Sequence, residues 1–241
     1  MTTVLLIRHG RTTANADGTL AGWTPGVHLD DLGNEQAAAL ATRLAVVPLT
    51  AVLSSPLDRC QQTAQAVAAE QKLTVQLDDD LGEVRYGEWT GQPLKSLSRD
   101  PLWKVVQQHP SAVTFPGDDG EGLAAMQARA VASVRRWNAE LGSDAVVAVV
   151  SHGDVIKALL ADALGMHLDL FQRITVDPAS LSVVRYANAR PFVERINDSG
   201  GDVSSLIPKK RRRKAPKSDD AVVGGGAGPA SRPSRSRRRI S

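Results

Sequence analysis

The chain has 241 residues, of which 42% are hydrophobic, so it is long enough to bury one substantial core. Its net charge of +3 hides two unlike parts: from Lys209 onward there are twelve Lys or Arg and two Asp, whereas residues 1–208 have 17 basic and 24 acidic side chains. One cysteine excludes an intramolecular disulfide, and no apolar run approaches the roughly 20 residues of a membrane-spanning helix. We therefore expect a cytoplasmic protein without a membrane segment.

The first third of the chain alternates between short apolar runs and helical patterns. A buried strand is predicted for residues 3–7, and the stretch "DDLGNEQAAALATRLAVV" after it has its apolar residues at helical spacing. Residues 51–54 form the next predicted strand, and "PLDRCQQTAQAVAAEQ" then opens with a proline suited to a first helical turn. A third strand is predicted for residues 73–77.

The second part of the body is irregular before it becomes regular again. Four prolines interrupt the stretch from residue 78 to Gly120, so we expect short helices at most and no sheet strand there. A long helix is predicted for residues 121–141, a fully buried central strand for "AVVAVV" and a further helix for residues 155–164. "RITVDPASLSVVRYA" predicts two strands around a turn at Asp177 and Pro178. This alternation indicates an α/β fold with a parallel sheet covered by helices.

The character of the sequence changes at about Ile207, where Lys, Arg, Ser, Pro and Gly begin to dominate. Such a segment buries too little apolar surface to offset its chain entropy. We therefore predict one domain, residues 1–206, and a disordered basic tail, residues 207–241. "PKKRRRKAPK" resembles a nuclear-import signal, and the tail has no aromatic residue for base stacking. Nonspecific binding to a polyanion and an extension without function are the two interpretations of this tail.

Two of the predicted strands end in a histidine followed by a glycine. "RHG" at residues 8–10 follows the first strand, and "SHG" at residues 151–153 follows the central one. Because the carboxyl ends of parallel strands face a shared crevice, neighbouring strands would bring both histidines together with Arg8 and with Arg59 from a following helix. Such a cationic cluster favours an anion, and a phosphoryl group matches the forked donors of guanidinium groups.

Four motifs, in this order and spacing, together resemble the histidine phosphatase superfamily, which includes the cofactor-dependent phosphoglycerate mutases. They are "RHG", "SSPLDRCQQTA", "LGEVRYGEWTG" and "SHGDVIK". The resemblance extends from about Val4 to Tyr186, which is nearly the whole body of the chain. It implies a three-layer α/β/α sandwich with a mostly parallel central sheet.

The resemblance also implies roles for six side chains. His9 would be the nucleophile that forms a phosphohistidine, and Glu83 would protonate the leaving oxygen. Phosphoryl oxygens would be held by the other four, Arg8, Asn15, Arg59 and His152. General chemistry fits these roles, because nearby arginines disfavour a cationic imidazole and a carboxyl beside a phosphate keeps its proton. No metal and no cofactor is expected, since no metal-ligand spacing and no "GxxxxGK" loop occurs.

Simpler explanations compete with several of these assignments. A purely structural role is the alternative for His9, His152 and Arg59. Glu88 competes with Glu83 as the acid, and we favour Glu83 because it aligns with the glutamate of the family. The two tryptophans near the predicted cleft, Trp23 and Trp89, are interpreted equally well as a pocket wall or as ordinary packing.

We predict a metal-independent phosphomonoester hydrolase that acts on a phosphorylated small molecule through a phosphohistidine. A phosphomutase of the phosphoglycerate mutase type is the first alternative. Ala21 weakens it, because the mutases have a hydroxyl residue there, and the insertion before "SHG" is shorter than their lid-bearing insertion. An inactive phosphatase-like scaffold with a polyanion-binding tail is the second alternative, and the intact set of motif residues argues against it.

Overall fold

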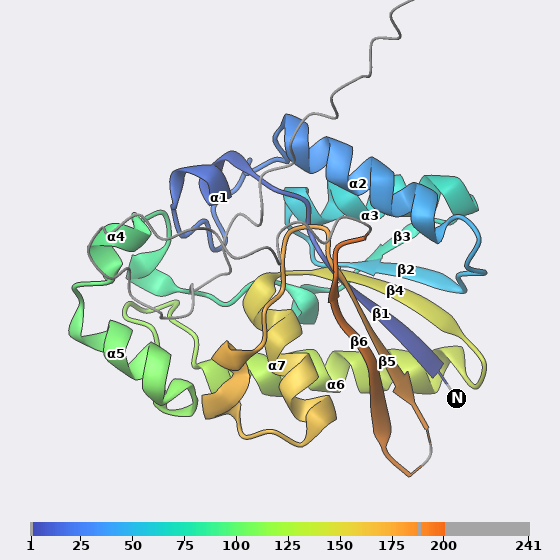
Figure 1. Ribbon diagram of the computed structural model, residues 1–241. Helices are drawn as coiled ribbons and strands as arrows, with labels where there is room; N and C mark the ends of the chain where they lie inside the picture. Colours follow the sequence, from blue (N-terminus) through green and yellow to red (C-terminus); the bar gives the residue numbers. More distant parts are fainter. Residues whose placement is uncertain (1, 188, 201–241) are drawn as a thin grey trace, which may run out of the picture.

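The computed structural model of the chain describes residues 2–187 and 189–200. Its centre is a six-stranded sheet with the strand order β3-β2-β4-β1-β5-β6 (Figure 1). The strands are β1 (Thr2–Arg8), β2 (Ala51–Ser54), β3 (Val75–Leu77), β4 (Val146–Ser151), β5 (Leu181–Tyr186) and β6 (Pro191–Asp198). Strands β1 to β4 are parallel to one another, whereas β5 and β6 pair antiparallel. The predicted mostly parallel central sheet is confirmed.

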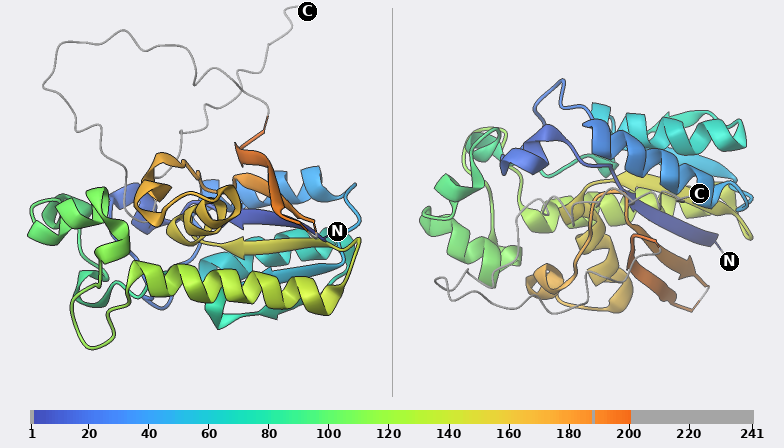
Figure 2. Two further views of the ribbon diagram at one scale, coloured as in Figure 1. Left: turned by 90° about the horizontal axis from the view of Figure 1, so that it is seen from below. Right: turned by 45° about the horizontal axis from the view of Figure 1, so that its top comes forward.

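Helices cover both faces of this sheet, which gives three layers (Figures 1 and 2). One face carries α2 (Asp31–Leu44) and α3 (Asp58–Gln71), and the other carries α6 (Leu123–Leu141) and α7 (Gly153–Leu164). Successive side chains of a strand point to opposite faces. On β1, Leu5 and Ile7 therefore join the core under α2 and α3, whereas Val4 and Leu6 join the core under α6 and α7. The three-layer α/β/α sandwich is confirmed.

The helix that follows β4 is unusually buried. Nine of the twelve residues of α7 are buried, and they include two charged side chains, Asp154 and Lys157. A buried charge is costly unless it is paired and hydrogen-bonded. The partners of Asp154 and Lys157 must therefore lie inside the protein, close to the carboxyl ends of the central strands.

The proline-rich stretch forms short helices and no strand of the sheet, as predicted. Its elements, with the small helix α1 before it, are α1 (Thr13–Asp17), η1 (Asp79–Leu81), η2 (Gly87–Trp89), α4 (Leu94–Leu97), α5 (Pro101–Gln108) and η3 (Pro110–Ala112). Trp89 is buried and stacks on Trp103 with 6.1 Å between ring centroids. It also packs edge-on against Phe115. The packing interpretation is therefore the right one for Trp89.

The end of the body differs from the prediction in two ways. The strand expected before Asp177 is wrong: after η4 (Leu168–Arg173) the chain runs as a loop, in which Ile174 and Val176 are buried without pairing to a strand. Burial alone produced the apolar pattern there. Strand β6 was missed, because at this edge of the sheet it exposes Phe192 and Ile196 and so lacks the alternation of a half-buried strand.

Two predictions concern the chain beyond these elements. The basic tail, residues 207–241, lies outside the described residues, as do the last residues of the predicted domain 1–206. In the part of the chain that the structure describes, no helix has both the length and the apolar character needed to cross a membrane.

Candidate active site

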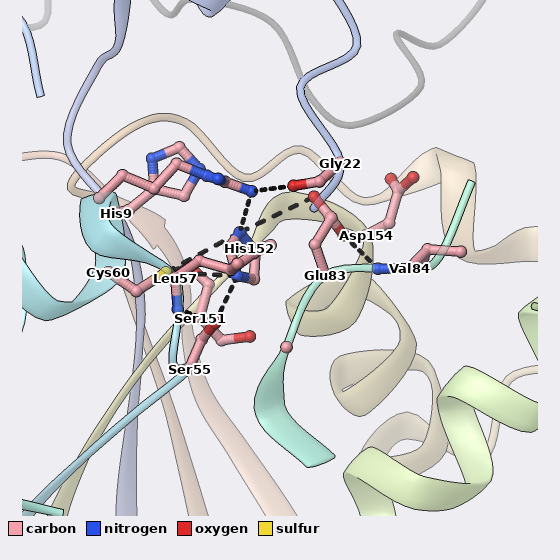
Figure 3. Close-up of polar contacts among 12 residues, drawn as sticks. His9, Gly22, Ser55, Leu57, Cys60, Glu83, Val84, Ser151, His152 and Asp154 are labelled. Atoms are coloured by element: carbon pink, nitrogen blue, oxygen red, sulfur yellow. Dashed lines mark hydrogen bonds and ion pairs between the residues drawn. The ribbon is translucent and has the colours of Figure 1, made fainter. Parts of the chain in front are cut away.

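The two strand-end histidines lie next to each other. β1 and β4 are neighbours in the sheet, and their register pairs Arg8 with Ser151, so His9 and His152 leave the sheet at the same level. The main-chain N–H of His9 donates to the carbonyl of Ser151 at 3.0 Å. The two imidazole rings are 5.3 Å apart between centroids and meet edge to face (Figure 3). The sheet itself therefore sets the spacing of this pair.

The glycine after His9 is required by close packing. A Cβ atom at Gly10 would lie 2.5 Å from the carbonyl oxygen of Gly33 in α2, which is closer than atoms can approach. The N–H of Gly10 donates to the hydroxyl of Thr63 in α3 at 3.1 Å. The turn after β1 is thus held against both helices of one layer, and this turn places the His9 ring at the end of the sheet.

The hydrogen bonding of His9 determines which ring nitrogen is available for reaction. Nδ1 lies 2.7 Å from the carbonyl oxygen of Gly10. A carbonyl only accepts, so Nδ1 carries the proton and Nε2 keeps its lone pair. Burial lowers the pKa of His9 well below its usual value, and the charges of Arg59 and Arg8 lower it further. His9 is therefore neutral at physiological pH and has a free nucleophilic nitrogen.

Both predicted arginines are buried in the site. Arg8 is 0% exposed and donates from Nη1 to the carbonyl of Val176 at 2.8 Å. Arg59, in the first turn of α3, donates from Nη2 to the carbonyl of Gly22 at 2.8 Å and to Nδ1 of His152 at 3.2 Å. Two guanidinium groups are thus fixed around the histidine pair, at the place where the sequence predicts an anion.

His152 is also held in a single neutral form. The guanidinium of Arg59 only donates, so Nδ1 of His152 accepts from it. Nε2 then carries the proton and donates to the hydroxyl of Ser55 at 2.8 Å. Burial lowers the pKa of His152 well below its usual value, and the charge of Arg59 adds to this effect. The thiol of Cys60 packs against the same ring, with Sγ 3.4 Å from Nε2.

Glu83 reaches the histidines from the irregular stretch. Its side chain is buried, with Oε2 3.9 Å from Nδ1 of His152 and Oε1 accepting from the N–H of Val84 at 3.0 Å (Figure 3). Burial raises the pKa of Glu83 to about 7, and the charge of Asp154 raises it as well, whereas Arg59 and Arg8 oppose the increase. Glu88 is exposed. Of the two glutamates, the structure therefore favours Glu83 as the candidate acid.

The segment that carries Glu83 is fixed by side chains from other elements. Arg129 of α6 donates from Nη1 to the carbonyls of Asp80 and Gly82 and from Nη2 to the carbonyl of Glu83. Trp23 donates from its indole N–H to the same Glu83 carbonyl at 2.6 Å. The hydroxyl of Ser151 donates to the carbonyl of Leu81 at 2.7 Å, which fastens the segment to the end of β4. Trp23 therefore positions the site as well as packing against it.

Asn15 is the predicted residue whose contacts lie outside this cluster. Its Oδ1 accepts from the N–H and the hydroxyl of Thr12, and Thr12 in turn accepts from the N–H of Asn15. This reciprocal pattern is a capping box at the start of α1. The structure thus gives Asn15 a local structural task, and its amide nitrogen is the group left to serve an anion.

Several buried residues of the site were missed in the sequence. Asp154 accepts from the hydroxyl of Tyr86 at 3.0 Å, and its other oxygen lies 3.4 Å from Nζ of Lys157. Ser55 and Thr63 orient His152 and the turn after His9. A signal for Asp154 existed: it is a charged residue at the start of the largely apolar helix that follows "SHG". Among the residues that the structure describes, no group of three or more His, Cys, Asp and Glu is arranged to hold a metal ion.

Comparisons with known proteins all indicate the same family. Residues 4–199 match the family model described as the histidine phosphatase superfamily (branch 1). The adenosylcobalamin/alpha-ribazole phosphatase of Escherichia coli is 33% identical over 184 residues, which are 74% of this chain and 87% of that protein. A probable phosphoglycerate mutase of Yersinia pestis is 30% identical over 210 residues, which are 86% of this chain and 95% of that protein.

A longer relative and a solved structure complete the comparison. A Mycobacterium tuberculosis protein named as bifunctional is 35% identical over 206 residues, which are 83% of this chain and 54% of the relative. The chain therefore spans about half the length of that relative. The crystal structure of a putative alpha-ribazole-5'-P phosphatase from Escherichia coli superposes with a TM-score of 0.74 at 29% identity, over 84% of this chain and 98% of that one.

Proposed function

Because the chain belongs to the histidine phosphatase superfamily, we propose that it is a phosphomonoester hydrolase that acts through a phosphohistidine on His9. One observation carries the proposal. The imidazole of His9 is neutral and has its Nε2 free, and it lies in one buried site with two arginines and with a carboxyl whose pKa is raised to about 7. These are the nucleophile, the charge-stabilising donors and the acid that phosphoryl transfer needs.

In the first half of the reaction, Nε2 of His9 attacks phosphorus and the bond from phosphorus to the ester oxygen breaks. The proton of Glu83 passes to that oxygen, so an alcohol leaves and Glu83 becomes a carboxylate. Arg8 and Arg59 hold the phosphoryl oxygens, and Asn15 adds its amide N–H. His152 joins them by exchanging the Arg59 donor on Nδ1 for a proton, because its Nε2 proton is bonded to Ser55. The amino end of α7 follows His152 directly, and its main-chain N–H groups favour an anion in the same place.

In the second half, water replaces the alcohol. The Glu83 carboxylate takes a proton from the attacking water, the new oxygen bonds to phosphorus, and the bond from phosphorus to Nε2 breaks. Inorganic phosphate leaves, and His9 and protonated Glu83 are restored. No step needs a metal ion, because the arginines stabilise the charge of the transferring group.

The competing reaction returns the phosphoryl group to a sugar-acid hydroxyl, as in a phosphoglycerate mutase. A mutase must hold its intermediate and exclude water. Ala21 offers no hydroxyl to a substrate carboxylate, and this supports hydrolysis. A phosphorylated small molecule is the substrate class that we propose, and alpha-ribazole phosphate belongs in the first set of compounds because of the relative named for it.

The test is a screen of phosphorylated metabolites for release of inorganic phosphate, with and without a strong chelator. We expect net hydrolysis that survives chelation, and at most feeble interconversion of 2- and 3-phosphoglycerate. Robust mutase turnover stimulated by 2,3-bisphosphoglycerate, with little phosphate released, would reverse the choice of reaction. Loss of activity on chelation, with recovery on adding a divalent ion, would overturn metal independence.

The basic tail and the location of the protein belong to the same proposal. Twelve basic side chains after residue 208 support contact with a polyanion, and the single cysteine supports a cytoplasmic location. Truncation after Leu206 should leave phosphatase activity nearly intact and abolish binding to heparin at low salt. A truncated protein that binds heparin as well as the full chain would show that the tail is not the binding segment.

The substrate screen also tests the alternative of an inactive scaffold, which would release no phosphate from any of the compounds.

A further inference from the structure

A second carboxylate lies beside the proposed acid. Asp154, at the second position of α7, is 1% exposed, and in Figure 3 its side chain lies next to that of Glu83. The proposed reaction gives Asp154 no contact with the phosphoryl group. A buried carboxylate costs free energy, so its place next to an acid calls for a physical explanation.

Donors from Tyr86 and Lys157 contact the carboxylate of Asp154. The hydroxyl of Tyr86 donates to Oδ2 at 3.0 Å, and Nζ of Lys157 lies 3.4 Å from Oδ1. Lys157 is buried too and donates to Oε1 of Gln172 at 3.0 Å. The carboxyl of Glu83, by contrast, accepts from a neutral donor, the N–H of Val84. A negative charge on Asp154 disfavours ionisation of the neighbouring Glu83 and so favours the protonated form of Glu83.

We propose that Asp154 is a positioning residue that keeps the catalytic proton on Glu83 until the leaving oxygen takes it. The inference rests on the proposed function and deepens it. The residue that helps Glu83 to keep its proton then lies in α7, and not in the segment that carries Glu83 itself.

The other titratable groups around Glu83 are Arg8 from β1, Arg59 from α3, His152 before α7, Arg129 from α6, Tyr86 from the same segment and Lys157 behind Asp154. His152 and the Tyr86 hydroxyl are neutral, so the charged ones among them are cations. The positive charges of Arg59 and Arg8 lower the pKa of Glu83, and Asp154 is the charge that raises it. Without Asp154 the two arginines would face Glu83 unopposed, and burial alone would have to retain its proton.

The test is the pH dependence of kcat/KM for an alkyl phosphomonoester in Asp154→Asn. Asparagine keeps the shape of the side chain and an oxygen for the Tyr86 hydroxyl, and it removes the charge. We expect the alkaline limb of the profile to move down by about one pH unit, because a like charge beside the acid is gone. The rate with p-nitrophenyl phosphate, whose leaving group needs no proton, should stay close to that of the unchanged enzyme.

Tyr86→Phe is the matched control, because it breaks the same network and keeps the charge of Asp154. Its alkaline limb should stay in place. Lys157→Gln should shift the profile in the opposite direction. The positive charge of Lys157 partly cancels the negative charge of Asp154, so its removal should move the alkaline limb to higher pH. A limb that moves in Tyr86→Phe as in Asp154→Asn, or that stays in place in both Asp154→Asn and Lys157→Gln, would overturn the proposal.

Glu83→Gln separates this inference from the proposed function. If it abolishes the alkaline limb while Asp154→Asn leaves the limb in place, Glu83 is the acid and the role of Asp154 is refuted. If the limb survives Glu83→Gln, the limb belongs to another group, and the acid role of Glu83 itself is wrong.

Discussion

The active site has two halves that are built in different ways: the histidine half, which contains His9 and His152, and the acid half, which contains Glu83. Arg8, His9 and His152 stand at the ends of two adjacent parallel strands, where the ladder of the sheet fixes them. Glu83 stands on an irregular segment between the 3-10 helices η1 and η2, and side chains from α6, β4 and the loop at Trp23 fix it. The position of the proposed nucleophile thus depends on main-chain hydrogen bonds of the sheet, whereas that of the proposed acid depends on a few side-chain contacts.

The same burial also acts on the two halves in opposite directions. Burial disfavours charge, so it lowers the pKa of His9 and raises the pKa of Glu83. The charges of Arg59 and Arg8 strengthen the effect on His9. For Glu83 the charge of Asp154 strengthens the effect, and the two arginines oppose it. One buried site therefore holds a neutral base and, below pH 7, a neutral acid, which is the state that the proposed phosphoryl transfer to His9 requires.

Glu83→Gln should separate the two halves most sharply. With an alkyl phosphate the turnover rate should fall by roughly 10³-fold, since the alkoxide then leaves without a proton. With an activated aryl phosphate the loss should be less than tenfold, because the histidine half still performs the transfer. Glu88→Gln, at an exposed position, is the matched control and should leave both rates unchanged. Equal losses on both substrates would mean that Glu83 does not supply the proton.

The raised pKa of Glu83 should also be visible in stability. The ordinary value is 4.5 and the folded value is about 7, so between these pH values the folded state binds more protons than the unfolded state. Stability therefore falls as pH rises from 4.5 to 7, by roughly 3 kcal/mol from this group, and the loss is complete above pH 7. Urea unfolding of the unchanged protein and of Glu83→Gln should show a difference that grows across this window and then levels off. A difference that is constant with pH would contradict the burial of an uncharged Glu83.

Arg129→Gln should make the segment that carries Glu83 less well fixed, without affecting the histidines. It removes the donors to three carbonyls around Glu83, so we expect roughly a tenfold loss with the alkyl phosphate, because the acid is then less well placed. The aryl phosphate should be affected much less. Arg135→Gln, on the same helix and more exposed, is the control for the loss of one cation from α6 because its ion pair with Asp162 lies away from the segment of Glu83. An equal loss on both substrates would indicate a general structural defect.

The contrast between the halves also explains what the sequence predicted and what it did not. His9, His152, Arg8 and Arg59 follow or flank apolar strands, and the ends of parallel strands meet, so the cluster was predictable from position. Glu83 was identified only through the resemblance to a family, because nothing in an irregular stretch tells where its side chain goes. Asp154 was missed because a single charged residue near a helix start usually faces solvent.

The strand errors have a related cause. Periodicity reports burial rather than pairing, so the buried loop at Ile174 and Val176 was predicted as a strand, and the edge strand β6 was not recognised. The parallel sheet covered by helices was predicted correctly because strongly apolar strands and amphipathic helices alternate over most of the chain. The three layers and the mostly parallel character of the sheet came from the resemblance to the family. Polar contacts over long sequence distances, such as those of Arg129, leave no local pattern in the sequence.

The most direct test of the proposed mechanism is to trap the phosphoenzyme. Enzyme mixed with a phosphorus-labelled substrate and quenched within milliseconds should carry label on protein, and the linkage should be stable in base and labile in acid, as expected for a phosphohistidine. His9→Ala should carry none and should show no turnover, whereas His109→Ala, at an exposed surface histidine, should carry as much as the unchanged enzyme. Label that persists in His9→Ala, or a linkage that survives acid, would contradict the assignment of His9 as the nucleophile.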